Sequence, residues 1–239
     1  MFEAAVREGV CRLSHPEARW LATGWDGGYA TAAAAINVSV PEGFERTDLA
    51  AYVEERRRGA GFEGSGPALL TGLDVTHARG ARADGVTVVA TAGLSNPASL
   101  PLERATTVDA ATGTALPDDD RAPPPGTVNL LVGTDRALAD GTLATLLATA
   151  VEAKTATLSA ATGFTGTTSD AVAVGTDPTG ESAPFAGSGT RVGTATRACV
   201  RDALLASLRS RYPDGGLPDA VADAEYGTAT RRETSEFRP

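Results

Sequence analysis

The sequence predicts an α+β fold, a single layered domain in which a mixed or antiparallel sheet packs against two long amphipathic helices and a shorter one. Three observations lead to this expectation. Strand and turn signals fill the first third of the 239 residues, two long helical patterns occupy the second half, and a polar segment between them interrupts the strands. A chain of this length can bury most of the surface that its unfolded form exposes.

The first third has the pattern of a β-meander. Strands are expected at residues 9–14 and 19–24, and a turn follows at residues 26–28. An alanine-rich extended stretch then runs through Asn37 to Pro41.

A short helix is expected next. Thr47 has a side chain suited to an N-cap, the helix ends near Arg58, and the glycine-rich residues 59–61 stop it. Residues 68–73 and 86–93 then have the composition of two further strands.

Residues 94–125 are rich in proline, aspartate and threonine and are expected to form an exposed loop or insertion. Neither half of the chain has a full set of core elements without the other, so we expect one domain over residues 1–212. Residues 213–239 form a polar tail, in which residues 225–230 are a candidate edge strand.

The second half holds the clearest elements. Residues 127–134 have the pattern of a buried strand, and a long helix capped by Asp140 extends to about residue 161. Residues 170–176 form a further strand. The last helix, at about residues 190–211, has apolar side chains at helical spacing.

The charge pattern is typical of a protein that stays hydrated in a salt-filled cytoplasm. The net charge is -9, and Lys154 is the only lysine among the 21 basic residues. The acidic balance argues against nucleic-acid binding. No apolar run is long enough for a membrane span or a secretion signal, so we expect a cytoplasmic protein without membrane contact and leave a homo-oligomer open.

Lys154 occupies an unusual position for a charged residue. On a helical wheel it falls about 20° from Leu143, within the apolar face of the long helix. An ammonium without partners in a core costs several kcal/mol, so this side chain must reach solvent at the rim, pair with a carboxylate or work in a site. We favour a functional pocket. Glu152 lies on nearly the opposite side of the helix, so the two cannot bind one small group while the helix is regular.

Three weaker candidates accompany Lys154. Asp170 begins a strand after the Gly/Thr-rich residues 166–169, where it either serves a site or caps a turn. Asn129 lies in an apolar strand, where its amide either pins a neighbouring loop or binds an amide-bearing ligand. Gly187 and Gly189 precede the last helix and would let a ligand approach its N-terminus.

Several common chemistries lack support. His15 and His77 are the only histidines, and the spacing of Asp74 and His77 is too common by chance to indicate a metal site, so none is expected. There is no Gly-x-Ser-x-Gly elbow, Walker loop or Rossmann glycine pattern. Cys11 and Cys199 are expected in the core, since two distant cysteines do not make a disulfide framework.

Six segments of the second half, in this order, closely resemble the CbiZ family of adenosylcobinamide amidohydrolases. They are residues 126–132, 134–135, 138–141, 152–155, 169–172 and 186–193. Residues 13–41 resemble the N-terminal half of the family less sharply. In many relatives a histidine is expected near Asn37, where this chain has Val38 and Ser39, so the resemblance does not supply an imidazole base.

The resemblance implies an activity. It implies hydrolysis of the amide that joins aminopropanol to a propionate arm of the corrin ring, which converts adenosylcobinamide to adenosylcobyric acid in salvage for coenzyme B12 synthesis. The cobalt corrinoid is then the small-molecule substrate, and no cofactor is expected.

Such a reaction needs an activated water or side-chain nucleophile, donors for the oxyanion and an acid for the departing amine. Taken with the resemblance, Asp170 would position or deprotonate water, and Lys154 would stabilise the oxyanion or alter the protonation of the carboxylate. Glu152 is a rival general base and Thr155 a rival nucleophile. The expected substrate-binding residues, of which the first two would orient the amide, are Asn37, Asn129, Asp135, Gly187 and Gly189.

Two other functions stay open at this point. A corrinoid-binding module without hydrolysis is favoured by the missing base near Asn37, and an amidase for another bulky amide keeps the chemistry with a different substrate. A charged pair in a pocket would favour an enzyme.

Overall fold

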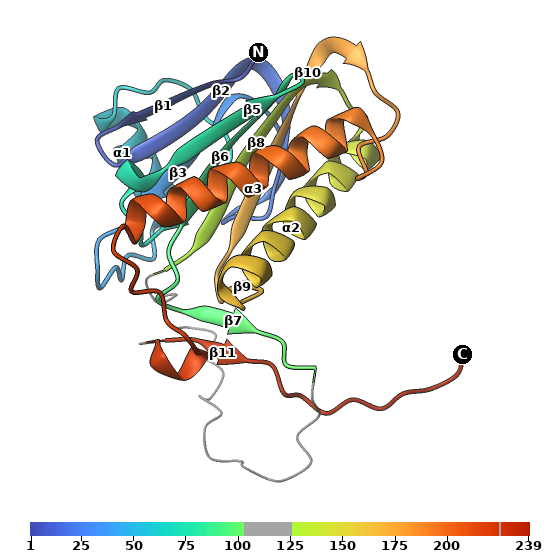
Figure 1. The fold of residues 1–239 in the computed structure, drawn as a ribbon. Helices are drawn as coiled ribbons and strands as arrows, with labels where there is room; N and C mark the ends of the chain where they lie inside the picture. Colours follow the sequence, from blue (N-terminus) through green and yellow to red (C-terminus); the bar gives the residue numbers. More distant parts are fainter. Residues whose placement is uncertain (103–125, 225) are drawn as a thin grey trace.

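The computed structural model describes residues 1–102, 126–224 and 226–239, and it confirms the α+β class (Figure 1). An eight-stranded mixed sheet packs with three helices, and a second sheet of three short strands lies beyond one end of it. The elements are, in chain order, β1 (Glu3–Arg7), β2 (Val10–Ala22), β3 (Gly28–Ser39), α1 (Leu49–Gly59), β4 (Ala68–Thr71), the 3-10 turn η1 (Val75–His77), β5 (Arg79–Ala83), β6 (Val86–Ala92), β7 (Pro97–Ser99), β8 (Val128–Ala137), α2 (Asp140–Thr162), β9 (Gly166–Thr167), β10 (Ala171–Ser182), α3 (Arg191–Arg211), the 3-10 turn η2 (Val221–Asp223) and β11 (Thr228–Ala229).

The large sheet joins the two halves of the chain where β2 meets β10. Its strand order is β4-β3-β2-β10-β8-β6-β5, and β1 pairs with the first part of β2. The pairs β3–β4 and β8–β10 are parallel, and the other neighbours are antiparallel. Parallel neighbours need a long crossover, and α2 provides it between β8 and β10. These three elements therefore form a βαβ unit.

Helices α2 and α3 cover one face of this sheet (Figure 1). The strands present alternate residues to the helices, as the period of a strand requires. Full burial of each Val or Leu side chain contributes about 1.5–3 kcal/mol, so this layer is the main core. Its members include Val86, Val88, Leu130, Val132, Val172 and Val174 from the strands, and Leu143, Leu146, Leu158, Val192, Val200 and Leu204 from the helices.

The other face is concave because the sheet curls. Strands β3 and β4 are separated from β8 by β2 and β10 in the strand order, yet both contact β8. Inside the curl, the rings of Phe2 and Trp20 pack edge to face with centroids 5.5 Å apart. A Cβ at Gly133 would lie 2.3 Å from the Phe2 ring, and one at Gly175 would lie 2.7 Å from the Trp20 ring. These two strand glycines therefore make room for the aromatic core.

The small sheet supports the turn that precedes β10. Its order is β11-β7-β9, and it lies beyond the C-terminal end of α2 (Figure 1). β9 pairs antiparallel with β7, with Thr167 opposite Pro97, and β11 pairs parallel with β7. Because β9 leads directly into the turn before β10, these pairings fix where that turn lies.

Most expected elements are present, with different boundaries in the first half. Residues 10–22 form one strand with an irregularity between Ser14 and Ala18, in place of two strands. The sequence pattern does not predict β1 or β5, because the residues of both strands are at most partly buried and include few large apolar side chains. Asp48, and not Thr47, is the N-cap position of α1, and its carboxylate bonds Arg46 in place of a helix amide.

The start of α2 and the extent of the expected loop at residues 94–125 also differ from the prediction. Ala139 is the N-cap position of α2, and Asp140 is the first helical residue, where its negative charge lies near the positive end of the helix dipole. In the expected loop, Leu94 and Asn96 are fully buried and residues 97–99 form β7, whereas residues 103–125 lie outside the described residues. The candidate edge strand in the tail is present as β11.

No helix within the described ranges is long and apolar enough to cross a membrane. Cys11 and Cys199 are buried and unpaired, as expected of core residues. Burial raises the pKa of the Cys11 thiol to about 12 and that of the Cys199 thiol to about 11. Both thiols are therefore protonated and unreactive at neutral pH.

Replacing Gly133 by alanine should lower the free energy of unfolding by about 1–3 kcal/mol, because the new Cβ meets the buried ring of Phe2. Gly141→Ala is the control, since a Cβ there meets nothing within 4 Å and alanine favours a helix. Urea unfolding of both variants measures the difference. Equal loss of stability in the two variants would contradict this account of the curl.

Candidate functional site

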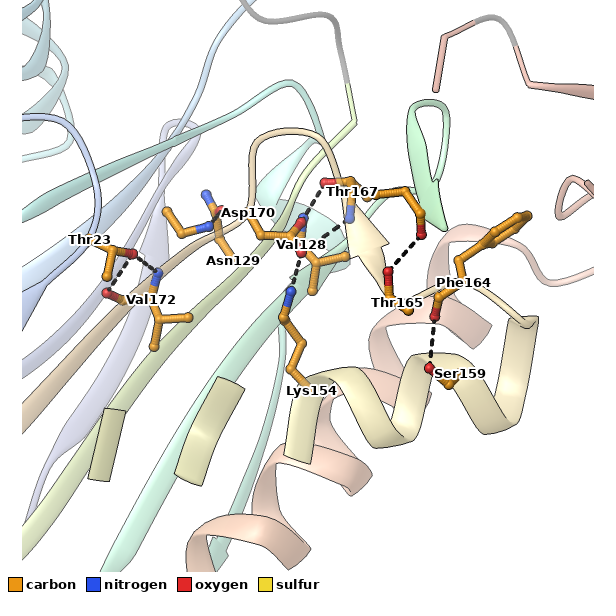
Figure 2. A network of polar contacts seen from close by, with 12 residues as sticks. Thr23, Val128, Asn129, Lys154, Ser159, Phe164, Thr165, Thr167, Asp170 and Val172 are labelled. Atoms are coloured by element: carbon orange, nitrogen blue, oxygen red, sulfur yellow. Dashed lines mark hydrogen bonds and ion pairs between the residues drawn. The ribbon is translucent and has the colours of Figure 1, made fainter. Parts of the chain in front are cut away.

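Lys154 and Asp170 form an ion pair at the end of the sheet near β9 (Figure 2). Lys154 projects from α2 with 6% of the residue exposed, and the Asp170 side chain, just before β10, is 12% exposed. A charge that is buried to this extent destabilises the fold unless it has a partner of opposite charge. Lys154 and Asp170 are such partners for each other. The structure thus brings together the two residues that the sequence analysis placed at the centre of the site.

The Asp170 carboxylate accepts three further hydrogen bonds (Figure 2). Oδ1 accepts from the backbone N–H of Val128, at 2.9 Å, and from the hydroxyl of Thr167. Oδ2 accepts from the backbone N–H of Thr167, at 3.1 Å, and from Lys154 Nζ. The carboxylate therefore ties together the start of β8, the β9–β10 turn and α2.

Gly166 leaves the space that the Lys154–Asp170 ion pair occupies. A Cβ at this position would lie 2.5 Å from Asp170 Oδ2 and 2.9 Å from Lys154 Nζ. A side chain there would displace the ion pair, so the glycine before Thr167 is part of the construction of the site.

Asn37 and Asn129 pin strands across the curl. Asn129 Nδ2 donates to Asn37 Oδ1 and to the carbonyl of Leu70, both at 2.9 Å, and its Oδ1 accepts from the N–H of Ala171 at 3.1 Å. Asn37 Nδ2 donates to Thr91 Oγ1 at 2.9 Å. Both asparagines are at most 3% exposed, so contact with a substrate amide would require these bonds to be exchanged. The observed bonds match the pinning role that the sequence left open for Asn129.

Asn96 and Ser169 lie beside the turn and were not singled out in the sequence. Asn96 is fully buried. Its Nδ2 donates to Thr168 Oγ1 at 2.7 Å, and its backbone carbonyl accepts from the Thr168 N–H at 3.2 Å. Its Oδ1 and the Ser169 hydroxyl are buried without a hydrogen-bond partner in the described structure. Unsatisfied groups of this kind are expected where water or a ligand completes the bonding. Asn96 was missed because its segment has the composition of an exposed loop.

The rival catalytic residues lie apart from the pair. Glu152 is exposed and pairs with Arg197 of α3, on the side of α2 away from Lys154. Thr155 is part-exposed and directly follows Lys154, but in the described part of the chain its hydroxyl makes no hydrogen bond to Asp170 or Lys154. Neither residue is brought to the carboxylate as Thr167 is.

The remaining expected binding residues lie toward the other end of the sheet. Asp135 is six residues along β8 from Asn129, a span of about 20 Å in a strand. Gly187 and Gly189 line an open cavity of about 600 Å³ near the N-termini of α2 and α3, together with Thr145. Thr145 and Lys154 are separated by about 14 Å along the helix. One small group therefore cannot contact this cavity and the ion pair together.

The described residues bring no three His, Cys, Asp or Glu side chains together as a metal site. His15 Nε2 lies 3.3 Å from Asp177, and His77 Nδ1 lies 3.1 Å from the Ser210 hydroxyl. Neither histidine makes a contact with the Lys154–Asp170 pair.

Comparison with known proteins gives one family. The family model described as CbiZ, adenosylcobinamide amidohydrolase, matches residues 3–215. A curated protein of Halobacterium salinarum named adenosylcobinamide amidohydrolase is 51% identical over 241 residues, which cover 100% of both chains. A crystal structure of a Pyrococcus horikoshii protein aligns with a TM-score of 0.43 and 12% identity, over 87% of this chain and 79% of the other, a similarity too weak to support any inference.

The stability losses caused by removing the two charges of the pair should not be additive. Lys154→Met or Asp170→Asn alone leaves a buried charge unpaired and should cost about 3–5 kcal/mol of stability. The double variant should lose less than the sum of the single losses, by about 1–3 kcal/mol. Urea unfolding of the three variants checks the coupling. Strictly additive losses would mean that the two charges do not interact.

Proposed function

Since the chain belongs to the CbiZ family of adenosylcobinamide amidohydrolases, we infer that it hydrolyses the aminopropanol amide of adenosylcobinamide. The products are adenosylcobyric acid and aminopropanol, in salvage of cobinamide for coenzyme B12 synthesis. The cobalt corrinoid is the substrate, and we propose that the reaction uses no separate cofactor. We also propose a cytoplasmic location, which the acidic, lysine-poor composition supports.

The buried Lys154–Asp170 pair is the observation that carries the catalytic proposal. An ammonium has three N–H donors, and among the described residues Lys154 donates only to Asp170. The remaining donors, on a side chain that is nearly inaccessible to water, are available to a substrate oxygen. We propose that Lys154 binds the amide carbonyl and stabilises the oxyanion that forms on it.

Asp170 has two roles in this proposal. Its negative charge keeps Lys154 at the end of the sheet in the orientation that the oxyanion requires. Its carboxylate also takes the proton of the attacking group and returns a proton to the leaving amine. Without that proton the amine would have to depart as an anion.

The supporting residues hold the carboxylate in place. Asn129 binds the N–H of Ala171, the residue after Asp170, and Asn37 in turn binds Asn129. We propose that these two asparagines act on the amide indirectly, by fixing the start of β10. Contacts of the corrinoid with Gly187, Gly189 or Asp135 would have to come from parts of the ligand distant from the amide.

The test is incubation of the purified protein with adenosylcobinamide in high-salt buffer, with the corrinoid product followed by mass. Conversion to adenosylcobyric acid is expected. Tight binding without conversion would instead indicate a corrinoid-binding module, and neither binding nor conversion would point to another bulky amide.

Variants of Lys154 and Asp170 test whether the ion pair takes part in the reaction. Lys154→Met, Asp170→Asn and their double variant should each lose at least about a hundredfold in turnover, because an oxyanion donor or a proton acceptor is removed. The double variant is informative because its loss of stability should be smaller than the sum of the single losses, whereas its turnover should stay as low as that of the single variants. Asp84→Asn, which breaks the exposed pair with Arg191, is the control and should turn over normally. Wild-type turnover in both single variants would disprove the assignment.

A further inference from the structure

The hydrogen bonds of Asp170 leave little room for a water molecule. An ionised carboxylate offers about four lone-pair positions. In the structure these receive the two backbone N–H groups of Val128 and Thr167, the Lys154 ammonium and the Thr167 hydroxyl. A water could reach the carboxylate only by displacing one of these donors. The Thr167 hydroxyl is already in place, with its proton directed at the base.

We propose that Thr167 Oγ1 is the nucleophile, and that hydrolysis proceeds through an ester between Thr167 and the propionate arm of the corrinoid. This inference rests on the proposed function and adds the identity of the attacking group. Three side chains then act in sequence: Thr167 attacks, Asp170 takes its proton, and Lys154 orients the carboxylate. A nucleophile in contact with a base that a third group orients is the arrangement found in covalent hydrolases.

Lys154 completes the arrangement from the other side of the carboxylate. It donates to Oδ2, whereas the Thr167 hydroxyl donates to Oδ1. The amide carbon would therefore be attacked by Thr167 while its oxygen lies within reach of the unused N–H groups of Lys154. Donors placed where the oxyanion forms are the main requirement of acyl transfer.

The depth of Thr167 suits the shape of this substrate. Thr167 is 8% exposed, but its neighbour Thr168 is exposed, so the hydroxyl lies one residue below the surface. The reacting amide is carried on a slender arm, which can reach past the exposed Thr168 while the larger ring stays outside. Asn96 Oδ1 and the Ser169 hydroxyl, both unpartnered in the described residues, adjoin the same turn and are suited to polar groups of that arm.

The reaction balances with water as the only co-reactant. The Thr167 oxygen forms a bond to the amide carbon as its proton passes to Asp170, and the carbonyl electrons move to the oxygen facing Lys154. The C–N bond then breaks, Asp170 gives the proton to the nitrogen, and aminopropanol leaves the ester. Water next adds to the ester carbon and gives a proton to Asp170. When the bond to Thr167 breaks, Asp170 returns this proton to the threonine oxygen, and the carboxylic acid of the corrinoid is released.

The first experiment compares two threonines of the same turn. Thr167→Val removes the proposed nucleophile and should lower turnover at least about a thousandfold, whereas Thr167→Ser keeps a hydroxyl and should stay within about tenfold of wild type. Thr165→Val is the matched control, because its hydroxyl donates to the Ala98 carbonyl and not to Asp170. Circular dichroism and thermal melting confirm that all three variants are folded. Equal turnover of Thr167→Val and Thr165→Val would refute the proposal.

The second experiment asks for the ester itself and stays informative if Thr167→Val misfolds. Hydroxylamine added during turnover should divert an ester intermediate to the corrinoid hydroxamate in the wild type and in Thr167→Ser, with a rate of substrate loss that is unchanged or raised. Wild-type turnover that yields only adenosylcobyric acid at all hydroxylamine concentrations would mean direct attack by water. In that case the amidohydrolase function stands and only the nucleophile is wrong, whereas a wild type that leaves adenosylcobinamide intact contradicts the function itself.

Discussion

The buried charge pair between Lys154 and Asp170 is the constraint on which this end of the molecule depends. A buried ammonium is tolerated only with a partner, and the carboxylate that serves it is itself held by the backbone of β8 and of the β9–β10 turn. The small sheet, Gly166 and the asparagine network across the curl all serve to keep that carboxylate where it is. In the proposed mechanism, the atoms that stabilise this end of the molecule are also the atoms that carry out the reaction.

The fold class was predictable because its signals are local. The apolar periodicity of α2 and α3 and the buried pattern of β8 each lie within one segment, so the sequence alone indicates them. The curl of the sheet was not predictable, because it depends on Phe2 and Trp20 fitting against Gly133 and Gly175, residues far apart in the chain. The strands β1 and β5 turn only small, partly buried alanines to the core and so have no clear sequence pattern.

The candidate site was likewise predictable only where its signals lie within one segment. Lys154 was visible as a charge on an apolar helix face, and Asp170 as a carboxylate at a strand start. Their contact depends on how α2 packs beside β10, and the bond from the Val128 N–H to Asp170 depends on the parallel register of β8 and β10, so no single segment encodes either. The Thr167 hydroxyl lies only three residues before Asp170 and was missed although it belongs to the same turn. Glu152 matched a family segment, yet the rotation of the helix directs it to solvent and to Arg197. Asn96 was hidden by the composition of its neighbours.

The βαβ unit formed by β8, α2 and β10 has a consequence for how this protein can change. The groups of the proposed site all belong to that unit or to the turn within it, so they come from one continuous stretch of chain; they are Val128, Lys154, Thr167 and Asp170. The meander of β1 to β3 contributes mainly support, for example the Thr23 hydroxyl that accepts from the N–H of Val172 at 3.0 Å. In the proposed mechanism, substitutions in the meander can therefore alter the surroundings of the site while the groups that carry out the reaction stay unchanged.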